Sequence, residues 1–107
     1  AIIRVDIAAA DYYYTKFTHP NSFSSSPTLT DGVTWTGSTV VSSHSVAGMS
    51  AYEAAKVVVS NTTKYTMTLA GSTWFKVAST ASYGSADNTA LPAGNYTAMI
   101  VAECIAK

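Results

Sequence analysis

The segment that most constrains the fold of this chain is residues 91–105, near its end. It opens with a turn signal, Pro-Ala-Gly-Asn. From Tyr96 to Ile105, two sets of side chains alternate with the period of two that a β-strand imposes, and both sets are largely apolar. Such a run is typical of a strand that is buried on both faces. We therefore predict a central or interface strand here, covered by other sheets.

The composition favours strands and a weakly charged surface. Charged residues make up 11% of the chain and the formal net charge is zero, whereas about a quarter of an average soluble domain is charged. Ser and Thr fill most polar positions and favour strands together with Val, Ile, Tyr and Trp. The low content of Lys and Arg argues against a nucleic-acid partner. Weak charge repulsion favours association with other protein surfaces.

Short strand-like segments recur along the chain. Ile3, Val5 and Ile7 alternate with Arg4 and Asp6, which predicts a strand with one wet face. Further strands are expected at residues 11–18, 33–36, 39–41, 56–60, 64–69, 73–78 and 91–105. We predict an all-β, single-domain antiparallel β-sandwich or jelly roll over residues 1–107. It has seven to eight short strands and at most one short helix, placed at residues 51–55.

The segments between these strands give further expectations. Gly37-Ser38 predicts a break or a bulge, and the turn at residues 70–72 predicts a hairpin that joins segment 64–69 to segment 73–78. Loops are expected at residues 19–32, 42–50 and 79–90. The first of them is long for a compact domain and therefore a candidate for function. Its Phe23 can pin the loop to the body or to a partner.

No cluster of side chains indicates an enzyme. Cys104 is the single cysteine and lies in an apolar run, where a free cysteine is usually a small buried hydrophobe rather than a nucleophile paired with His19 or His44. A lone cysteine excludes an internal disulfide and is consistent with synthesis in a reducing cytoplasm. The acids are scattered and the two histidines lie far apart, so we expect neither a metal nor a cofactor. No run approaches the ~20 apolar residues of a membrane span.

The aromatic residues are the best candidates for contact with a partner. Three consecutive tyrosines place aromatic rings on both faces of one strand, and Tyr is favoured at interfaces. Trp35 and Trp74 belong either to the core or, with the tyrosines, to a platform that stacks on a sugar. The predicted partner-contact residues are Tyr12, Tyr13, Tyr14, Phe17 and Phe23.

As a whole, the chain resembles the small head-decoration (cement or staple) proteins of tailed bacteriophages. The resemblance is one of style and size over the full chain. The segments that show it are 1–7 (Ala-Ile-Ile-Arg-Val-Asp-Ile), 33–37 (Val-Thr-Trp-Thr-Gly) and 91–98 (Leu-Pro-Ala-Gly-Asn-Tyr-Thr-Ala). It implies a β-sandwich or jelly roll that binds the outside of a mature capsid without catalysis and bridges major capsid subunits. It also implies a homo-oligomer, a dimer or a trimer, on the capsid surface of the virion, synthesised in the host cytoplasm.

Two other classes of function remain open at this point. A fimbrial or pilus subunit would use an N-terminal strand such as residues 2–8 to complete the sheet of a neighbour by strand addition. A carbohydrate-binding module would use the tyrosines and the tryptophans as a stacking platform. An enzyme ranks last.

Overall fold

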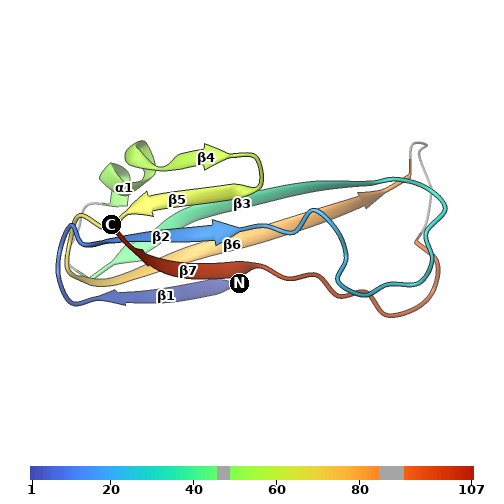
Figure 1. Ribbon diagram of the computed structural model, residues 1–107, viewed down its shortest axis with the longest axis horizontal. Coiled ribbons are helices and arrows are strands. Elements are labelled where there is room, and N and C mark those ends of the chain that lie inside the picture. Colours follow the sequence, from blue (N-terminus) through green and yellow to red (C-terminus); the bar gives the residue numbers. More distant parts are fainter. Residues whose placement is uncertain (46–48, 85–90) are drawn as a thin grey trace.

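The computed structural model describes residues 1–45, 49–84 and 91–107, which form seven strands in two antiparallel sheets and one short helix (Figure 1). The predicted all-β sandwich is therefore confirmed. Sheet A has the order β1-β6-β3, with β1 (Ile2–Ile7), β6 (Gly71–Tyr83) and β3 (Val33–His44). Sheet B has the order β4-β5-β2-β7, with β4 (Val57–Val59), β5 (Thr62–Thr66), β2 (Tyr13–Thr18) and β7 (Val101–Ala106).

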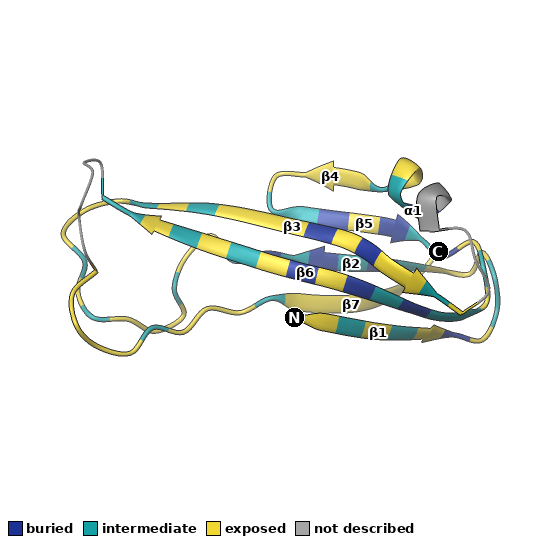
Figure 2. Cartoon of the chain, turned by 180° about the vertical axis from the view of Figure 1, so that it is seen from behind, coloured by how far each residue is buried: buried dark blue, intermediate teal, exposed yellow. Residues whose placement is uncertain are grey.

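The core lies between the sheets and is built around three aromatic rings. Phe17 of β2 packs 4.8 Å from Phe75 of β6, and Tyr65 of β5 lies 4.9 Å from the same ring, measured between ring centroids. All three side chains are fully buried, as are Met67 and, almost completely, Val77. Alternation along the strands supplies this core, because buried and exposed residues follow each other with a period of two (Figure 2).

Several local predictions are confirmed. β1 turns Ile3, Val5 and Ile7 towards the core and exposes Arg4 and Asp6. Helix α1 (Met49–Ala55) runs directly into β4, as the change from helix formers to β-branched residues predicts.

The predicted hairpin at residues 70–72 is wrong. β5 belongs to sheet B, where it pairs with β4 and β2, whereas β6 belongs to sheet A, where it pairs with β1 and β3. The turn therefore carries the chain from one layer to the other. The physical reason is that Tyr65 and Phe75 enter the same core from opposite layers, which two strands of one hairpin cannot provide.

The predicted break at Gly37 is also wrong, because β3 continues through this residue and Gly37 pairs with Ser79 of β6. The bulge lies further on, between Val41 and Ser43. Gly37 has a different role, since a Cβ atom at this position would lie 2.4 Å from Cγ of His19. The strands also replace parts of two predicted loops, because β3 reaches His44 and β6 reaches Tyr83. Residues 46–48 and 85–90 of these loops lie outside the described residues.

The prediction of a central strand, buried on both faces, at residues 91–105 is the largest correction; the alternative of an interface strand stays a prediction. The strand is only β7, it lies at the edge of sheet B, and every residue in it is exposed. Residues 91–100 have no regular strand, and their contacts include a bridge between Ser25 and Thr97 and the ring of Tyr96 against Phe23. Cys104 is accordingly exposed rather than buried. Apolar alternation identifies a strand, but it does not fix how many neighbours that strand receives.

Candidate functional site

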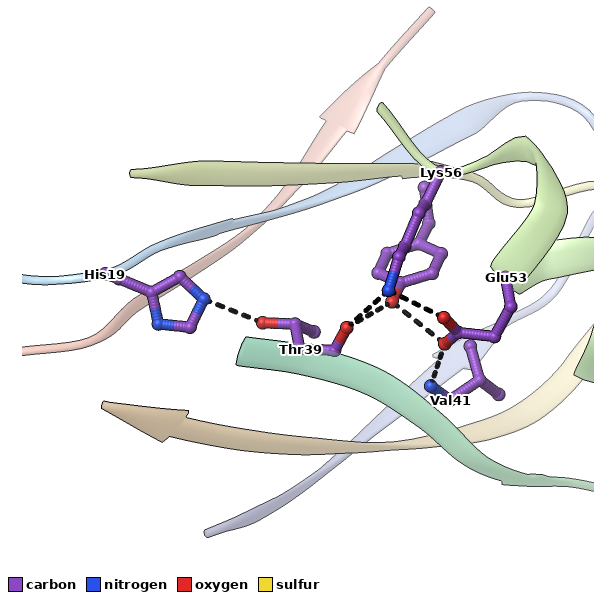
Figure 3. A network of polar contacts seen from close by, with 6 residues as sticks. His19, Thr39, Val41, Glu53 and Lys56 are labelled. Atoms are coloured by element: carbon purple, nitrogen blue, oxygen red, sulfur yellow. Dashed lines mark hydrogen bonds and ion pairs between the residues drawn. The ribbon is translucent and has the colours of Figure 1, made fainter. Parts of the chain in front are cut away.

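One side of the sandwich is closed by side chains from α1 and the residue after it (Figure 3). Val77 exchanges backbone hydrogen bonds with Ala1, so Thr39, which faces Val77 on β3, directs its own carbonyl away from β6. Lys56 Nζ and Tyr65 Oη each donate a hydrogen bond of 3.0 Å to that carbonyl. The Thr39 carbonyl at the free edge of β3 is thus satisfied from within the molecule.

Glu53 is the centre of this network. Its carboxylate accepts a hydrogen bond from the Val41 N–H, shares the single proton of Tyr65 Oη with the Thr39 carbonyl, and forms an ion pair of 2.7 Å with Lys56. Burial alone would raise the pKa of Glu53. Hydrogen bonds from Lys56 and Val41, with the charge of Lys56, outweigh burial and hold this pKa below its ordinary value. Burial, followed by the neighbouring carboxylate, raises the pKa of Tyr65 far above its ordinary value.

His19 continues the network towards the other end of β3. Its Nε2 lies 2.9 Å from Thr39 Oγ1, and its Nδ1 lies 2.9 Å from Ser79 Oγ. Burial lowers the pKa of His19, so the ring is neutral at pH 7. The ring therefore links β2, β3 and β6 through hydroxyl groups. Because both ring nitrogens lie on hydroxyl groups, His19 does not form the pair with Cys104 that a nucleophilic cysteine would need.

Sheet B presents a different kind of surface on the side that faces away from the core, which we call the outer face of sheet B. It consists of the outward side chains of the four strands of that sheet and of the residue after β7. The Tyr14 ring lies under two cations, with Lys64 Nζ at 4.5 Å and Lys107 Nζ at 5.8 Å from its centroid. A groove of about 380 Å³ runs over this face, with walls formed by Tyr14, Lys16, Val57, Val59, Lys64 and Ile105.

Exposed aliphatic side chains distinguish this face. Val57 is 50% exposed and Val59 is 63% exposed, although both are β-branched strand residues. Val101 and Ile105 of β7 add further exposed apolar surface at the other side of the sheet. An apolar surface bordered by lysines is the composition expected of a protein-binding face.

The five predicted contact residues occupy different places. Tyr12 is 66% exposed, and Tyr14 belongs to the outer face of sheet B. Tyr13 alternates to the other side of β2 and lies near Cys104, where both line one groove. Phe17 is 0% exposed and belongs to the core, so its prediction as a partner contact is wrong. Its place in the alternation of β2, beside buried Thr15, is the physical reason.

Phe23 pins the long loop to the body of the protein. Its ring lies 4.7 Å from Trp35 and 5.1 Å from Tyr96, measured between centroids. Trp35 is therefore a half-buried anchor for the loop, and Trp74 lies under the guanidinium of Arg4 at 5.6 Å. The two tryptophans belong to separate clusters and neither is fully buried, so they do not form the shared core that one interpretation of the sequence predicted.

Sequence reasoning missed the aliphatic and basic members of the outer face, namely Val57, Val59, Ile105, Lys64 and Lys107. The only signal in the sequence was the run of three valines before the turn at Ser60, which was interpreted as an ordinary strand. No group of three or more His, Cys, Asp or Glu side chains able to hold a metal occurs in residues 1–45, 49–84 and 91–107. In the same ranges, no helix is both long and apolar enough to span a membrane.

Comparisons with family models, with curated proteins and with solved structures find no significant match to this chain. Its function must therefore be argued from its own residues.

Proposed function

We propose that this chain is a non-enzymatic structural protein that binds the outside of a phage capsid and stabilises the mature shell by bridging major capsid subunits. The observation that supports this proposal is the outer face of sheet B. It combines exposed Val57 and Val59 with the Tyr14 ring under two lysines. Large apolar groups with a polar rim supply most of the binding energy at protein interfaces.

The charge of this face indicates the kind of surface that it binds. Lys16, Lys64 and Lys107 lie on it together with one acid, Glu103, although the whole chain is neutral. A partner surface with acidic groups around an apolar centre is therefore complementary. We propose that the major capsid protein presents such a surface and that the chain acts as a dimer or a trimer on the virion.

Stabilisation of the shell then follows from linkage. A protein that binds only the expanded state of the shell stabilises that state over all others. Many copies on a symmetric shell make modest contacts collectively strong. This role needs neither a metal nor a cofactor.

The test is co-sedimentation of the protein with expanded and unexpanded phage heads, with one variant on each outer face. Val59→Glu places an acid on the outer face of sheet B and is expected to weaken binding to expanded heads by about tenfold or more. Val40→Glu places the same acid on the outer face of sheet A, at a side chain that is 37% exposed, and is expected to bind normally. Equal behaviour of the two variants, or no binding of the unmodified protein to either form, would refute the proposal.

A further inference from the structure

The two sides of the sandwich differ in how far their strand edges are covered. On one side, Glu53 and Lys56 satisfy two backbone groups at the edge of β3, the Val41 N–H and the Thr39 carbonyl. On the other side lie β1 and β7, which are the last strands of their sheets. Figures 1 and 2 show β1 further out than β7 at this side, in the other layer. The edge of β7 is therefore accessible, and β1 (Ile2–Ile7) extends beneath it in the other layer. We call this projecting strand the ledge.

Among the described residues, the backbone groups of β7 that point to this side have no hydrogen-bond partner. The Lys107 N–H donates to the Tyr12 carbonyl, so the odd-numbered residues of β7 bond to β2. Ala102, Cys104 and Ala106 then direct their N–H and C=O groups away from the sheet. All residues of β7 are exposed. A row of unpaired strand groups is a template for another strand.

The space between β7 and the ledge is a groove of about 300 Å³. Its walls include Ile3 and Val5 of β1 and Ala102 and Cys104 of β7, and Thr15 also lines it. Thr15 is 1% exposed, and its hydroxyl has no hydrogen-bond partner within the part of the chain that the structure describes. A second groove continues from Cys104 towards Tyr13 and Ile7. The site therefore combines apolar side chains with three charged lining residues, Arg4, Asp6 and Glu103, and with one buried hydroxyl that lacks a partner among the described residues.

We propose that the free edge of β7 is a strand-addition site that takes an extended segment of a partner protein. The segment becomes a fifth strand of sheet B and covers the ledge formed by β1. This site is the backbone edge of β7 rather than the outer face of sheet B, although Glu103 and Lys107 border both. The inference goes beyond the proposed binding of capsids. An extended backbone is the occupant that matches a row of N–H and C=O groups at the repeat of a strand.

Charge complementarity specifies the segment further. Glu103 of β7 and Lys107, the residue after β7, lie four residues apart on the outer side of the sheet. An antiparallel segment therefore carries a base opposite Glu103 and an acid opposite Lys107, because opposite charges facing each other across strands stabilise the pair. Its inward side chains are apolar and cover Ile3 and Val5. The residue opposite Cys104 is an exception, since a glutamine there is long enough to reach past the small thiol towards the Thr15 hydroxyl.

The ledge also distinguishes between two possible occupants of the site, namely a single extended segment and the edge strand of a second copy of the sandwich. β7 itself has an acid and a base four residues apart, so two copies of β7 could pair by charge alone. A two-fold pairing would place both copies of β1 in the same layer beneath the junction, where each sheet A already extends beyond its β7 (Figure 1). A single strand from a chain tail or a loop has no second sheet behind it, so it fits at the edge of β7 without a clash between the two copies of β1.

The experiment is an amide-resolved NMR titration of the whole chain with three synthetic acetylated peptides. The matched peptide is Glu-Val-Thr-Gln-Lys-Val-Thr. The charge-reversed peptide, Lys-Val-Thr-Gln-Glu-Val-Thr, has the same composition, and the third peptide has Leu in place of Gln. We expect the matched peptide to shift the amides of Ala102, Cys104 and Ala106 and to protect the Cys104 thiol from alkylation. The charge-reversed peptide is expected to bind about tenfold more weakly.

Two variants make the result specific. Ala102→Pro removes an N–H that points away from β2, so the fold is retained while affinity falls by about tenfold or more. Ala102→Thr retains the N–H and is expected to bind normally. Thr15→Val is expected to abolish the preference for Gln over Leu. The proposal is overturned if no amide of β7 shifts at millimolar peptide, or if Ala102→Pro binds as well as Ala102→Thr. It is also overturned if the protein alone assembles into a continuous series of larger oligomers, because the occupant of the β7 edge is then a second copy of this chain.

Discussion

Replacement of Gly37 by Ala tests how closely β3 approaches the end of β2. A Cβ atom at residue 37 would lie 2.4 Å from Cγ, 2.7 Å from Nδ1 and 2.9 Å from Cβ of His19. The φ angle of Gly37 is not positive, unlike those of Gly71, Gly84 and Gly94. The backbone therefore accepts an L-residue at this position, and the effect of the substitution is steric.

The size of the effect follows from how firmly His19 is held. The ring is buried, and its two nitrogens bond to Thr39 and Ser79. Overpacking of a closed site costs about 1–3 kcal/mol, and displacement of the ring weakens hydrogen bonds worth about 1 kcal/mol each. The reduced freedom of the unfolded chain offsets about 0.4–1 kcal/mol. We expect Gly37→Ala to lower the free energy of unfolding by about 2–3 kcal/mol.

The assay is urea unfolding followed by tryptophan fluorescence, with Gly32→Ala as the matched control. A Cβ atom at Gly32 meets no atom within 4 Å, so the control is expected to change stability by less than about 0.5 kcal/mol. Of the three nearest contacts, the 2.9 Å contact with Cβ is the one that remains in a His19→Ala background, and the effect of Gly37→Ala should fall by at least half. Equal stability of Gly37→Ala and the unmodified protein would refute the reasoning, and an unchanged effect in the His19→Ala background would refute the assignment to the ring.

Three further predictions concern single side chains. Thr73→Val should raise the free energy of unfolding by about 1 kcal/mol in chemical denaturation, because the fully buried hydroxyl has no partner among the described residues; a loss of stability would contradict this. The lowered pKa of Glu53 stabilises the fold above the unfolded value, near 4.5, and this contribution is lost as pH falls through the folded pKa. Glu53→Gln should therefore flatten the loss of thermal stability between about pH 5 and pH 3, and an unchanged acid limb would exclude this role. Phe17→Ala should cost about 3–5 kcal/mol in the same unfolding assay and Tyr12→Ser less than about 0.5 kcal/mol, so similar values would contradict their burial.

The sequence predicts the strands well, because alternation is a local property. Ile3, Val5 and Ile7 identify β1 without knowledge of its neighbours, and the change of residue type after Ala55 separates α1 from β4. Assignment of a strand to a sheet is not local. Tyr65 and Phe75 have the same apolar signal whether their strands form a hairpin or face each other across the core. No residue near positions 70–72 therefore argued against the predicted hairpin.

The candidate surface was less predictable than the fold for the same reason. Tyr12, Tyr14 and Phe17 are all aromatic residues of one segment, yet exposure separates them, and alternation alone does not say which face meets the second sheet. Val57 and Val59 look like core residues by type. They are exposed because β4 is short and because none of the described residues forms a third layer over its outer face.

The position of α1 explains why the two sides of the sandwich differ in how their strand edges are covered. The helix lies where the chain passes from β3 of one sheet to β4 of the other, and this crossing places Glu53 and Lys56 over the edge of β3. Nothing comparable covers β7 among the described residues, although an exposed strand edge in a weakly charged protein invites uncontrolled pairing. The two outward charges of β7, Glu103 and Lys107, do not block the edge as a bulge or a proline would, and they instead restrict which strand can pair. An edge that selects its partner is consistent with a protein that works in an assembly.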